Sequence, residues 1–439
     1  MVQYATFMRL QPLGWRHREW VWLAIVAVIL LARFPIHFWA EPPYLMDFDV
    51  YRTIAQRIAS GHAADLYRPT TSEMMVFKYG PCWALLWLPL AWLPGLVGAM
   101  VWSSLTTLWL VVACWASARL SERAGWPSPA WAAAAVALLL SRPIGAEFLN
   151  GQVDVLWGLL VIGFFLAPQG WLGALSLALA VSLKLPAALV PVYLLCRRRW
   201  RPALQCALLV LLLNGLAALV LHPANPLALF RDWTEVLSSS GPARAFEIGN
   251  QSLLALAGRF LSADVHQLNI GTLTPLTLVV IVGTVSMVLF AMVCAPRLRS
   301  MPDDVRLVVD GGLLTVLMVL CSPTAWIATY SALVLPVTLA LSAAVAQCGP
   351  ATGQACLRGN RAGGWGVDWM CATIAGALLV LSLMTHSTFW KALGIRHIRG
   401  ETYVFLVLMI LPWFALALWA FVWRLRSLSG YGRSSGGLA

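Results

Sequence analysis

The chain has 439 residues, of which 60% are hydrophobic and only 11% are charged, with a formal net charge of +12. A soluble globular domain carries roughly 25% charged residues and about half apolar ones, so this composition excludes an ordinary water-soluble fold. The basic residues lie in short clusters between apolar blocks, a pattern that membrane topology explains. We therefore expect no nucleic-acid partner. The cysteines and histidines lack metal-ligand spacing, so we expect neither a protein-held metal nor a cofactor.

The apolar residues fall in blocks close to the roughly 20 residues that cross a bilayer as helix. The first block, residues 20–34, follows Arg16 and Arg18 and precedes no cleavage pattern, so we expect a retained first span with a cytoplasmic amino terminus. Further blocks lie near 96–118, 131–148, 152–168, 170–184, 186–196, 201–221, 273–294, 308–322, 328–346, 367–386 and 401–422. They predict an all-α polytopic membrane protein with about twelve transmembrane helices, in one domain over residues 1–426.

Two stretches do not fit simple spans. The blocks on either side of Lys184 and Pro186 are short, which is typical of half-helices broken inside the protein. If residues 80–93 were a separate span, the arginine clusters would not all lie on one side of the membrane. The stretch therefore either enters the membrane without crossing it or begins one long bent helix, and the sequence leaves both open.

Arginine clusters orient the chain, because short cytoplasmic loops carry an excess of basic residues. This rule places three loops outside, residues 35–79, 222–271 and 386–401, and leaves residues 427–439 as a disordered cytoplasmic tail. The arginines concerned are Arg119, Arg123, Arg197, Arg198, Arg199, Arg201, Arg297, Arg299, Arg306, Arg358, Arg361, Arg424 and Arg426. Functional residues should concentrate in the outer loops.

The first outer loop carries Asp47 and Asp49 at the start of an amphipathic pattern that Gly61 closes. The pattern predicts a helix on the membrane surface, with two carboxylates at the lipid–water boundary. A carboxylate there can cap the helix through its first free amides. Alternatively it can serve as a general base that takes a proton from a sugar hydroxyl.

Lys184 is an ammonium in an otherwise apolar run, where a charge usually faces a cavity or a partner. A phosphate would suit it. A lysine that extends from a helix end to the outer headgroups would show the same sequence pattern.

Two amide pairs lie at the predicted outer side. Asn150 and Gln152 separate two apolar blocks, and Asn250 and Gln251 open another, with Arg259 following. Such amides can hold sugar hydroxyls, and they can equally be turn or capping residues.

Taken in chain order, these segments resemble glycosyltransferase family eighty-seven, a group with the GT-C fold that includes polyprenyl-phosphate-mannose-dependent α-1,2-mannosyltransferases. The resemblance extends over about residues 40–335 and rests on collinear short motifs. They are Asp47-Phe48-x-Val50-Tyr51, Gly61 with Leu66-Tyr67, Tyr79-x-Pro81, Pro89-Leu90, Asn150-Gly151-Gln152, Lys184-x-Pro186, Asn250-Gln251-Ser252 with Arg259, and Ser322-Pro323 with Trp326.

The resemblance implies a multi-pass enzyme of the inner (plasma) membrane that moves a hexose, with mannose the first candidate, from a polyprenyl-phosphate carrier to a glycolipid or glycan hydroxyl. The transfer would be inverting and take place at the periplasmic or exterior face. Asp47 would be the catalytic base, and Lys184 with Arg259 would bind the donor phosphate. The remaining candidates for substrate binding are Asp49, Tyr51, Tyr79, Asn150, Gln152, Asn250, Gln251 and Trp326.

One departure from the family concerns the segment after Trp326. Many members have a histidine there, whereas this chain continues Ile327-Ala328-Thr329-Tyr330, which leaves His222, His386 or Tyr330 as possible substitutes. The rival interpretation is a transporter or flippase of a lipid-linked sugar, in which Lys184 and the broken helices form a midplane site. Transporters usually have paired halves, and no second Lys-x-Pro segment is found.

Overall fold

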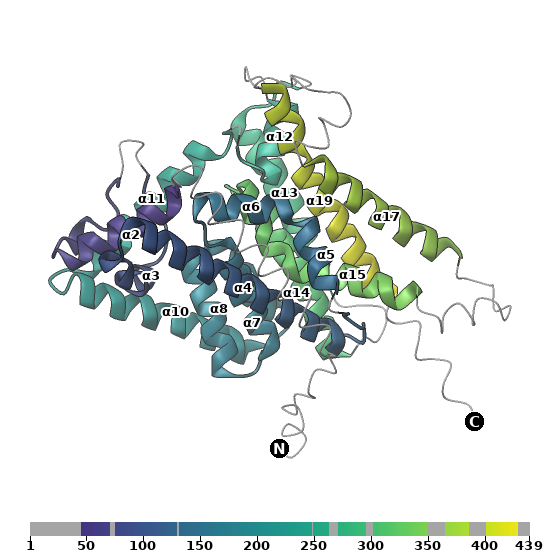
Figure 1. Ribbon diagram of the computed structural model, residues 1–439, viewed down its shortest axis with the longest axis horizontal. Coiled ribbons are helices and arrows are strands. Elements are labelled where there is room, and N and C mark those ends of the chain that lie inside the picture. Colours follow the sequence, from purple (N-terminus) through teal and green to yellow (C-terminus); the bar gives the residue numbers. More distant parts are fainter. Residues whose placement is uncertain are drawn as a thin grey trace, which may run out of the picture.

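The structure is a computed structural model that describes residues 45–70, 75–129, 131–247, 249–262, 271–295, 302–348, 365–385 and 401–428. Every regular element in these residues is a helix (Figure 1), so the all-α class is confirmed. The expected first span, nearly all of the loop at 386–401 and most of the tail lie outside the described residues.

Most apolar blocks form helices where they were predicted, because an apolar run satisfies its backbone hydrogen bonds internally only as a helix. These helices are α4 (Gly95–Arg123), α7 (Asp154–Leu166), α8 (Trp171–Leu183), α10 (Trp200–Leu221), α13 (Pro275–Cys294), α14 (Asp303–Leu320), α15 (Val334–Cys348), α17 (Trp365–Met384) and α19 (Glu401–Leu428). The block at 131–148 instead forms two helices, α5 (Trp131–Leu139) and α6 (Ser141–Asn150), which meet at 70°.

Within the described ranges, four segments are long and apolar enough to cross a membrane: Gly95–Arg123, Trp200–Leu221, Pro275–Cys294 and Ile327–Ala346. The bent pair α5–α6 would make a fifth. These segments indicate a multi-pass membrane protein. The number of twelve crossings and the single domain over 1–426 stay predictions.

The chain breaks at Lys184, as the short blocks indicated. Helix α8 ends at Lys184, whose backbone is extended, and a 3-10 turn, η4 (Leu185–Ala188), leads into α9 (Leu189–Cys196). Pro186 explains the break, because it has no amide hydrogen to donate to the Ser182 carbonyl four residues earlier, and that carbonyl instead accepts from the Gly80 amide.

Residues 80–93 form two short helices, α3 (Pro81–Leu86) and the 3-10 helix η3 (Leu88–Trp92). Leu93 is extended before Pro94, so α4 starts afresh at Gly95 and the stretch does not begin one long bent helix. Helix α3 packs against α2, α8 and α10.

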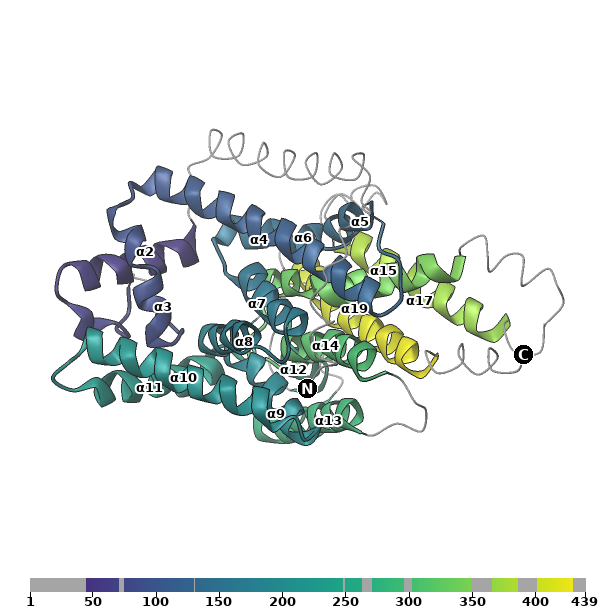
Figure 2. The same ribbon diagram turned by 90° about the horizontal axis from the view of Figure 1, so that it is seen from below.

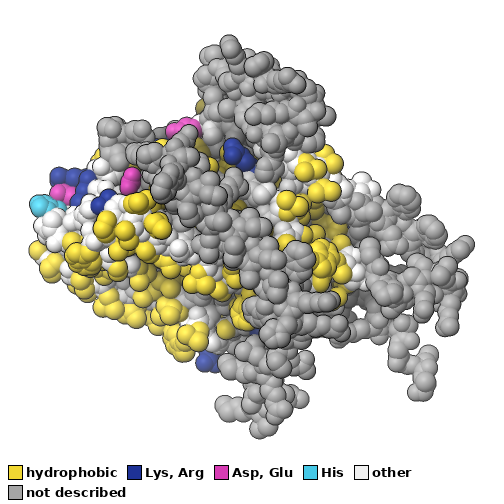
Figure 3. All heavy atoms as spheres, viewed as in Figure 1, with side chains coloured by type: hydrophobic (Ala, Val, Ile, Leu, Met, Phe, Trp, Pro, Cys, Tyr) yellow, Lys and Arg dark blue, Asp and Glu magenta, His cyan; other side chains and the backbone are white. Residues whose placement is uncertain are grey.

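The centre of the molecule is α14, whose residues from Leu307 to Leu320 are all buried. It packs against α7, α15 and α19. Gly311 permits the close approach of α7, since a Cβ there would lie 2.8 Å from the ring of Phe165. At the periphery, α10 and α13 expose many large apolar side chains, and Figure 3 shows a broad hydrophobic surface on the face it draws, as lipid contact requires.

The first outer segment contains the expected amphipathic helix, α2 (Met46–Ala59), with Phe48, Tyr51 and Ile54 buried on one side. The second is largely helical, with α11 (Pro226–Arg244) and α12 (Leu253–Leu261). Figures 1 and 2 agree that α2, α3, α10 and α11 lie at one end of the molecule, with α17 toward the other.

Candidate active site

A cavity of about 910 Å³ lies where α2, the segment 75–80, the end of α6, the break after α8, α11 and the loop after α14 meet. Five of its described lining residues are charged: Asp47, Lys78, Arg142, Lys184 and Arg244. One carboxylate thus shares the cavity with four basic side chains. Such a cavity favours an anionic ligand.

Asp47 lies in the first turn of α2 and is half-buried beside the cavity. Burial raises the pKa of its carboxyl from 3.8 to about 6, although Lys184, a hydrogen bond from Gln152 and Lys78 act in the opposite direction. The carboxylate is therefore ionised at neutral pH and more basic than an exposed aspartate. Asp49 is not among the cavity residues, and burial raises the pKa of its carboxyl while Arg52 lowers it.

Gly151 and Gln152 hold the end of α6 against the start of α2. Gly151 has a φ of 69°, and a Cβ there would lie 2.7 Å from the Cβ of Phe48. This contact places Gln152, which is 8% exposed and lines the cavity, within hydrogen-bond reach of Asp47. Asn150 also lines the cavity. The Asn-Gly-Gln motif thus combines a tight approach with a polar group at the carboxylate.

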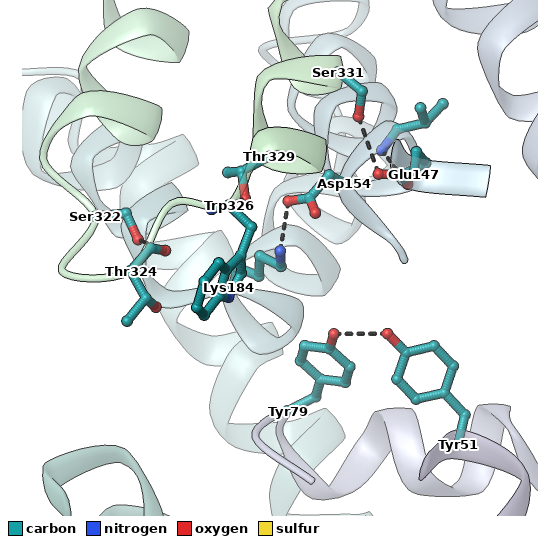
Figure 4. A network of polar contacts seen from close by, with 11 residues as sticks. Tyr51, Tyr79, Glu147, Asp154, Lys184, Ser322, Thr324, Trp326, Thr329 and Ser331 are labelled. Carbon is teal, nitrogen blue, oxygen red and sulfur yellow. Dashed lines mark hydrogen bonds and ion pairs between the residues drawn. The ribbon is translucent and has the colours of Figure 1, made fainter. Parts of the chain in front are cut away.

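Lys184 extends toward α7, where its Nζ lies 2.5 Å from Oδ1 of Asp154 (Figure 4). Asp154 is fully buried and the Lys184 side chain is 22% exposed, so the ammonium points into the protein and not toward lipid headgroups. Asp154 was missing from the sequence prediction. It could have been found as the carboxylate that opens an apolar block, which normally has a partner.

Tyr51 and Tyr79 meet across the cavity wall, with their hydroxyl oxygens 2.9 Å apart (Figure 4). Burial raises the pKa of both phenols, so both remain neutral hydroxyls. Behind this wall, Glu147 is 1% exposed and accepts hydrogen bonds from the Val155 amide at 3.0 Å and the Ser331 hydroxyl at 3.1 Å.

Trp326 also lines the cavity, and its ring lies against Gly249, where a Cβ would come within 2.5 Å of the indole. Neither Tyr330 nor His222 is a lining residue: the Tyr330 hydroxyl donates to the Gln251 carbonyl at 2.6 Å, and His222 accepts from the Asn225 amide at 3.1 Å. His386 lies outside the described residues.

The second amide pair has a different environment from the first. Asn250 is fully buried and uses its side chain to join two loops, donating to the carbonyls of Ala245 and Pro323 and accepting from the amides of Ser252 and Ala325. Gln251 is likewise buried. Arg259 donates to the Asn250 carbonyl, and none of these three side chains lines the cavity. The structure places them in the scaffold behind Trp326.

Comparison with known proteins decides the family. The profile of glycosyltransferase family 87 matches residues 77–323, which is more than half of the chain. The chain belongs to glycosyltransferase family 87. The match includes Lys78, Tyr79, Gln152, Asp154 and Lys184, whereas Asp47 precedes it.

Curated relatives of this family 87 protein are mycobacterial. A polyprenol-phosphate-mannose-dependent α-(1-2)-phosphatidylinositol mannoside mannosyltransferase of Mycobacterium tuberculosis is 29% identical over 208 residues, 42% of this chain and 47% of the relative. The corresponding enzyme of Mycolicibacterium smegmatis is 30% identical, over 38% of this chain and 41% of the relative. The chain therefore aligns with less than half the length of these two relatives.

Other comparisons extend further along the chain. A polyprenol-phosphate-mannose-dependent α-(1-2)-phosphatidylinositol pentamannoside mannosyltransferase of M. tuberculosis is 29% identical over 84% of this chain and 81% of the relative. A crystal structure of ArnT from Cupriavidus metallidurans bound to undecaprenyl phosphate is 16% identical, with a TM-score of 0.36 over 94% of this chain and 79% of that chain.

Proposed function

We propose that this family 87 protein transfers mannose from a polyprenyl-phosphate carrier to a hydroxyl of a glycolipid or glycan, with Asp47 as the general base. The observation that carries the proposal is the cavity, in which one carboxylate of raised pKa shares the lining with four basic side chains. The mycobacterial relatives are named as polyprenol-phosphate-mannose-dependent enzymes, which suggests the donor for this protein.

In the proposed reaction the acceptor hydroxyl attacks the anomeric carbon of the sugar while Asp47 takes the hydroxyl proton. The bond from the anomeric carbon to the phosphate oxygen breaks, and its electron pair leaves with the polyprenyl phosphate. The attack comes from the face opposite the phosphate, so the configuration inverts. Basic side chains of the cavity stabilise the negative charge on the leaving phosphate. No metal or cofactor takes part in this scheme.

We further propose a GT-C-like arrangement of about twelve spans in the plasma membrane, with the cavity facing the periplasm or the exterior. The arginine clusters on the opposite loops support this orientation. The amphipathic helix α2, which carries Asp47, would lie along the outer surface of the bilayer. A lipid-linked donor could then reach Asp47 from within the membrane.

The two cations first considered for the donor phosphate have other partners. The Lys184 ammonium is neutralised by Asp154, and the Arg259 guanidinium donates to loop carbonyls outside the cavity. We therefore assign Lys184 to the organisation of the cavity around Asp47, and Arg259 to the scaffold of the second outer segment.

The proposal is tested by transfer of radiolabelled mannose from polyprenyl-phosphate-mannose to phosphatidylinositol mannosides, with purified protein in detergent and chelator present. Asp47→Asn keeps the shape of the side chain but removes the base, and Asp49→Asn, on the same helix but outside the cavity, is the matched control. We expect labelled product from wild type and Asp49→Asn only.

Near-normal turnover in Asp47→Asn would contradict the role of Asp47. No product from any of the three proteins would contradict the donor or the reaction, and a flipping assay in liposomes would then test transport of a lipid-linked sugar.

A further inference from the structure

Lys78 is presented to the cavity by a backbone segment that is fixed from three sides. The Trp233 indole of α11 donates to the Lys78 carbonyl at 2.9 Å, and the Tyr67 hydroxyl donates to the Tyr79 carbonyl at 3.0 Å. The Gly80 amide donates to the Ser182 carbonyl of α8 at 2.8 Å. A lysine on such a segment has a preorganised position, which lowers the entropic cost of holding a ligand.

Arg142 and Lys78 are the cavity cations without a partner among the described residues, and Lys78 is the one that lies beside Arg244. In the part of the chain that the structure describes, the Lys78 ammonium forms neither a hydrogen bond nor an ion pair. Its basic neighbour Arg244, from α11, has a loose pair with Glu247 at 3.8 Å and donates to the Met75 sulfur at 3.7 Å. Lys184, by contrast, has Asp154 at 2.5 Å. Positive charge without a close counterion therefore remains at Lys78, beside the loosely paired Arg244, and at Arg142.

The titration of Lys78 agrees with this geometry. Burial lowers the pKa of its ammonium from 10.5 to about 8, and the neighbouring charges of Arg244 and Lys184 lower it further, while Asp47 and Glu247 act against this. Two like charges in a half-buried place, which Asp47 and Glu247 offset only in part, are unfavourable. A bound anion between them removes that penalty and restores the protonated form of the lysine.

We propose that Lys78 and Arg244 form the phosphate site of this cavity and hold the phosphate of a lipid phosphate ester. That the ligand is a lipid rests on the proposed function. That it carries a phosphate rests on the weakly compensated charges of Lys78 and Arg244. A guanidinium and an ammonium on one side of an anion offer charge-assisted hydrogen bonds to its oxygens. The assignment moves the phosphate away from Lys184, where the fully buried carboxylate of Asp154 would repel it.

Chemical footprinting tests this site on the wild-type protein. The sequence contains only three lysines, Lys78, Lys184 and Lys391, so acetylation by acetic anhydride can be followed at each of them by mass spectrometry. We expect decaprenyl phosphate to slow acetylation of Lys78 at least fivefold at pH 8, and decaprenol, which has the same chain without the phosphate, to leave the rate unchanged. Equal slowing by decaprenyl phosphate and decaprenol overturns the proposal, and so does a Lys78 that neither decaprenyl phosphate nor phosphatidylinositol protects.

The phosphate could come from the donor or from an anionic acceptor, and the same footprint separates them. Slower acetylation with decaprenyl phosphate alone assigns the site to the carrier. Slower acetylation with phosphatidylinositol alone assigns it to the acceptor. Either result supports a lipid-phosphate site at Lys78.

Variants provide the second measurement, equilibrium binding to protein in nanodiscs of the radiolabelled lipid that protects Lys78, either decaprenyl phosphate or phosphatidylinositol. Lys78→Gln should weaken binding at least tenfold, and Lys78→Arg, the matched control that keeps the charge, should retain affinity within threefold. Unchanged affinity in Lys78→Gln overturns the proposal.

Neither assay requires mannosyl transfer, so the two proposals can fail separately. A protected Lys78 without any labelled product contradicts the transferase proposal alone. Transfer by Lys78→Gln with the wild-type KM for both donor and acceptor contradicts the phosphate site alone.

Discussion

Removal of the Asp47 charge should stabilise the protein while it abolishes transfer. The pKa of this carboxyl is raised from 3.8 to about 6, so the folded protein disfavours the ionised form. A shift of this size corresponds to about 3 kcal/mol above pH 6. Because one side of Asp47 faces the cavity and its water, we expect about 1 to 3 kcal/mol. Asp47→Asn removes this penalty and keeps the volume of the side chain.

The size of the stabilisation by Asp47→Asn depends on pH. The cost of the buried charge is fully present above the folded pKa of about 6, decreases as pH falls, and vanishes below the unfolded value near 3.8. Unfolding entropy of roughly 2.1 cal/mol/K per residue makes 1 kcal/mol worth about 1 °C in a chain of this length. The Asn variant should therefore melt about 1 to 3 °C higher than wild type at pH 8, with the difference shrinking toward pH 5.

Thermal unfolding of purified protein in detergent, followed by tryptophan fluorescence at pH 5, 6, 7 and 8, measures this difference. Asp49→Asn, whose carboxyl is less buried, is measured beside it and should show a smaller difference. A lower melting temperature for Asp47→Asn at pH 8, or a difference that does not change with pH, would refute the reasoning from burial.

Two further predictions concern the residues that organise the cavity. Lys184→Met leaves Asp154 buried without its partner, so we expect a loss of about 3 to 5 kcal/mol, which Lys184→Met/Asp154→Leu should largely restore; equal melting of the single and double variants would contradict the ion pair. Gly151→Ala should lower both stability and turnover, since it combines a positive φ with a clash against Phe48. The control is Gly61→Ala, where φ is 82° and a Cβ would meet nothing within 4 Å. This variant should lose only the backbone cost of about 1 to 2 kcal/mol. Melting and initial transfer rates of the two Ala variants, compared side by side, measure the contribution of the contact, and equal losses would refute it.

Several features of the fold follow directly from local sequence. Apolar runs of membrane-spanning length predicted most of the helices, since backbone hydrogen bonding in lipid leaves few alternatives. Pro186 marked the break after α8, and the spacing of Phe48, Tyr51 and Ile54 predicted the amphipathic helix α2. These are properties of neighbouring residues, which the chain carries wherever it folds.

The sequence prediction was less accurate in two stretches that could form more than one local structure. The apolar run at 131–148 was predicted to be one span, although Pro143 in the first turn of α6 marks the bend between α5 and α6. The outer segment 222–271 was expected as a loop, yet it contains α11 and α12. Packing of these segments against distant helices decided between the alternatives.

By itself, the sequence determined that the chain is helical and membrane-embedded, and it singled out Asp47 and Lys184 as charges that need an explanation. Only the tertiary structure decided that Asp154 neutralises Lys184 from 30 residues away and that Asn250 joins two loops. It also decided that the Lys78 ammonium faces the cavity without a hydrogen-bond or ion-pair partner among the described residues. The reason is physical: helix formation depends on residues within a turn or two, whereas the charge balance of a cavity depends on side chains that folding brings together from many separate segments.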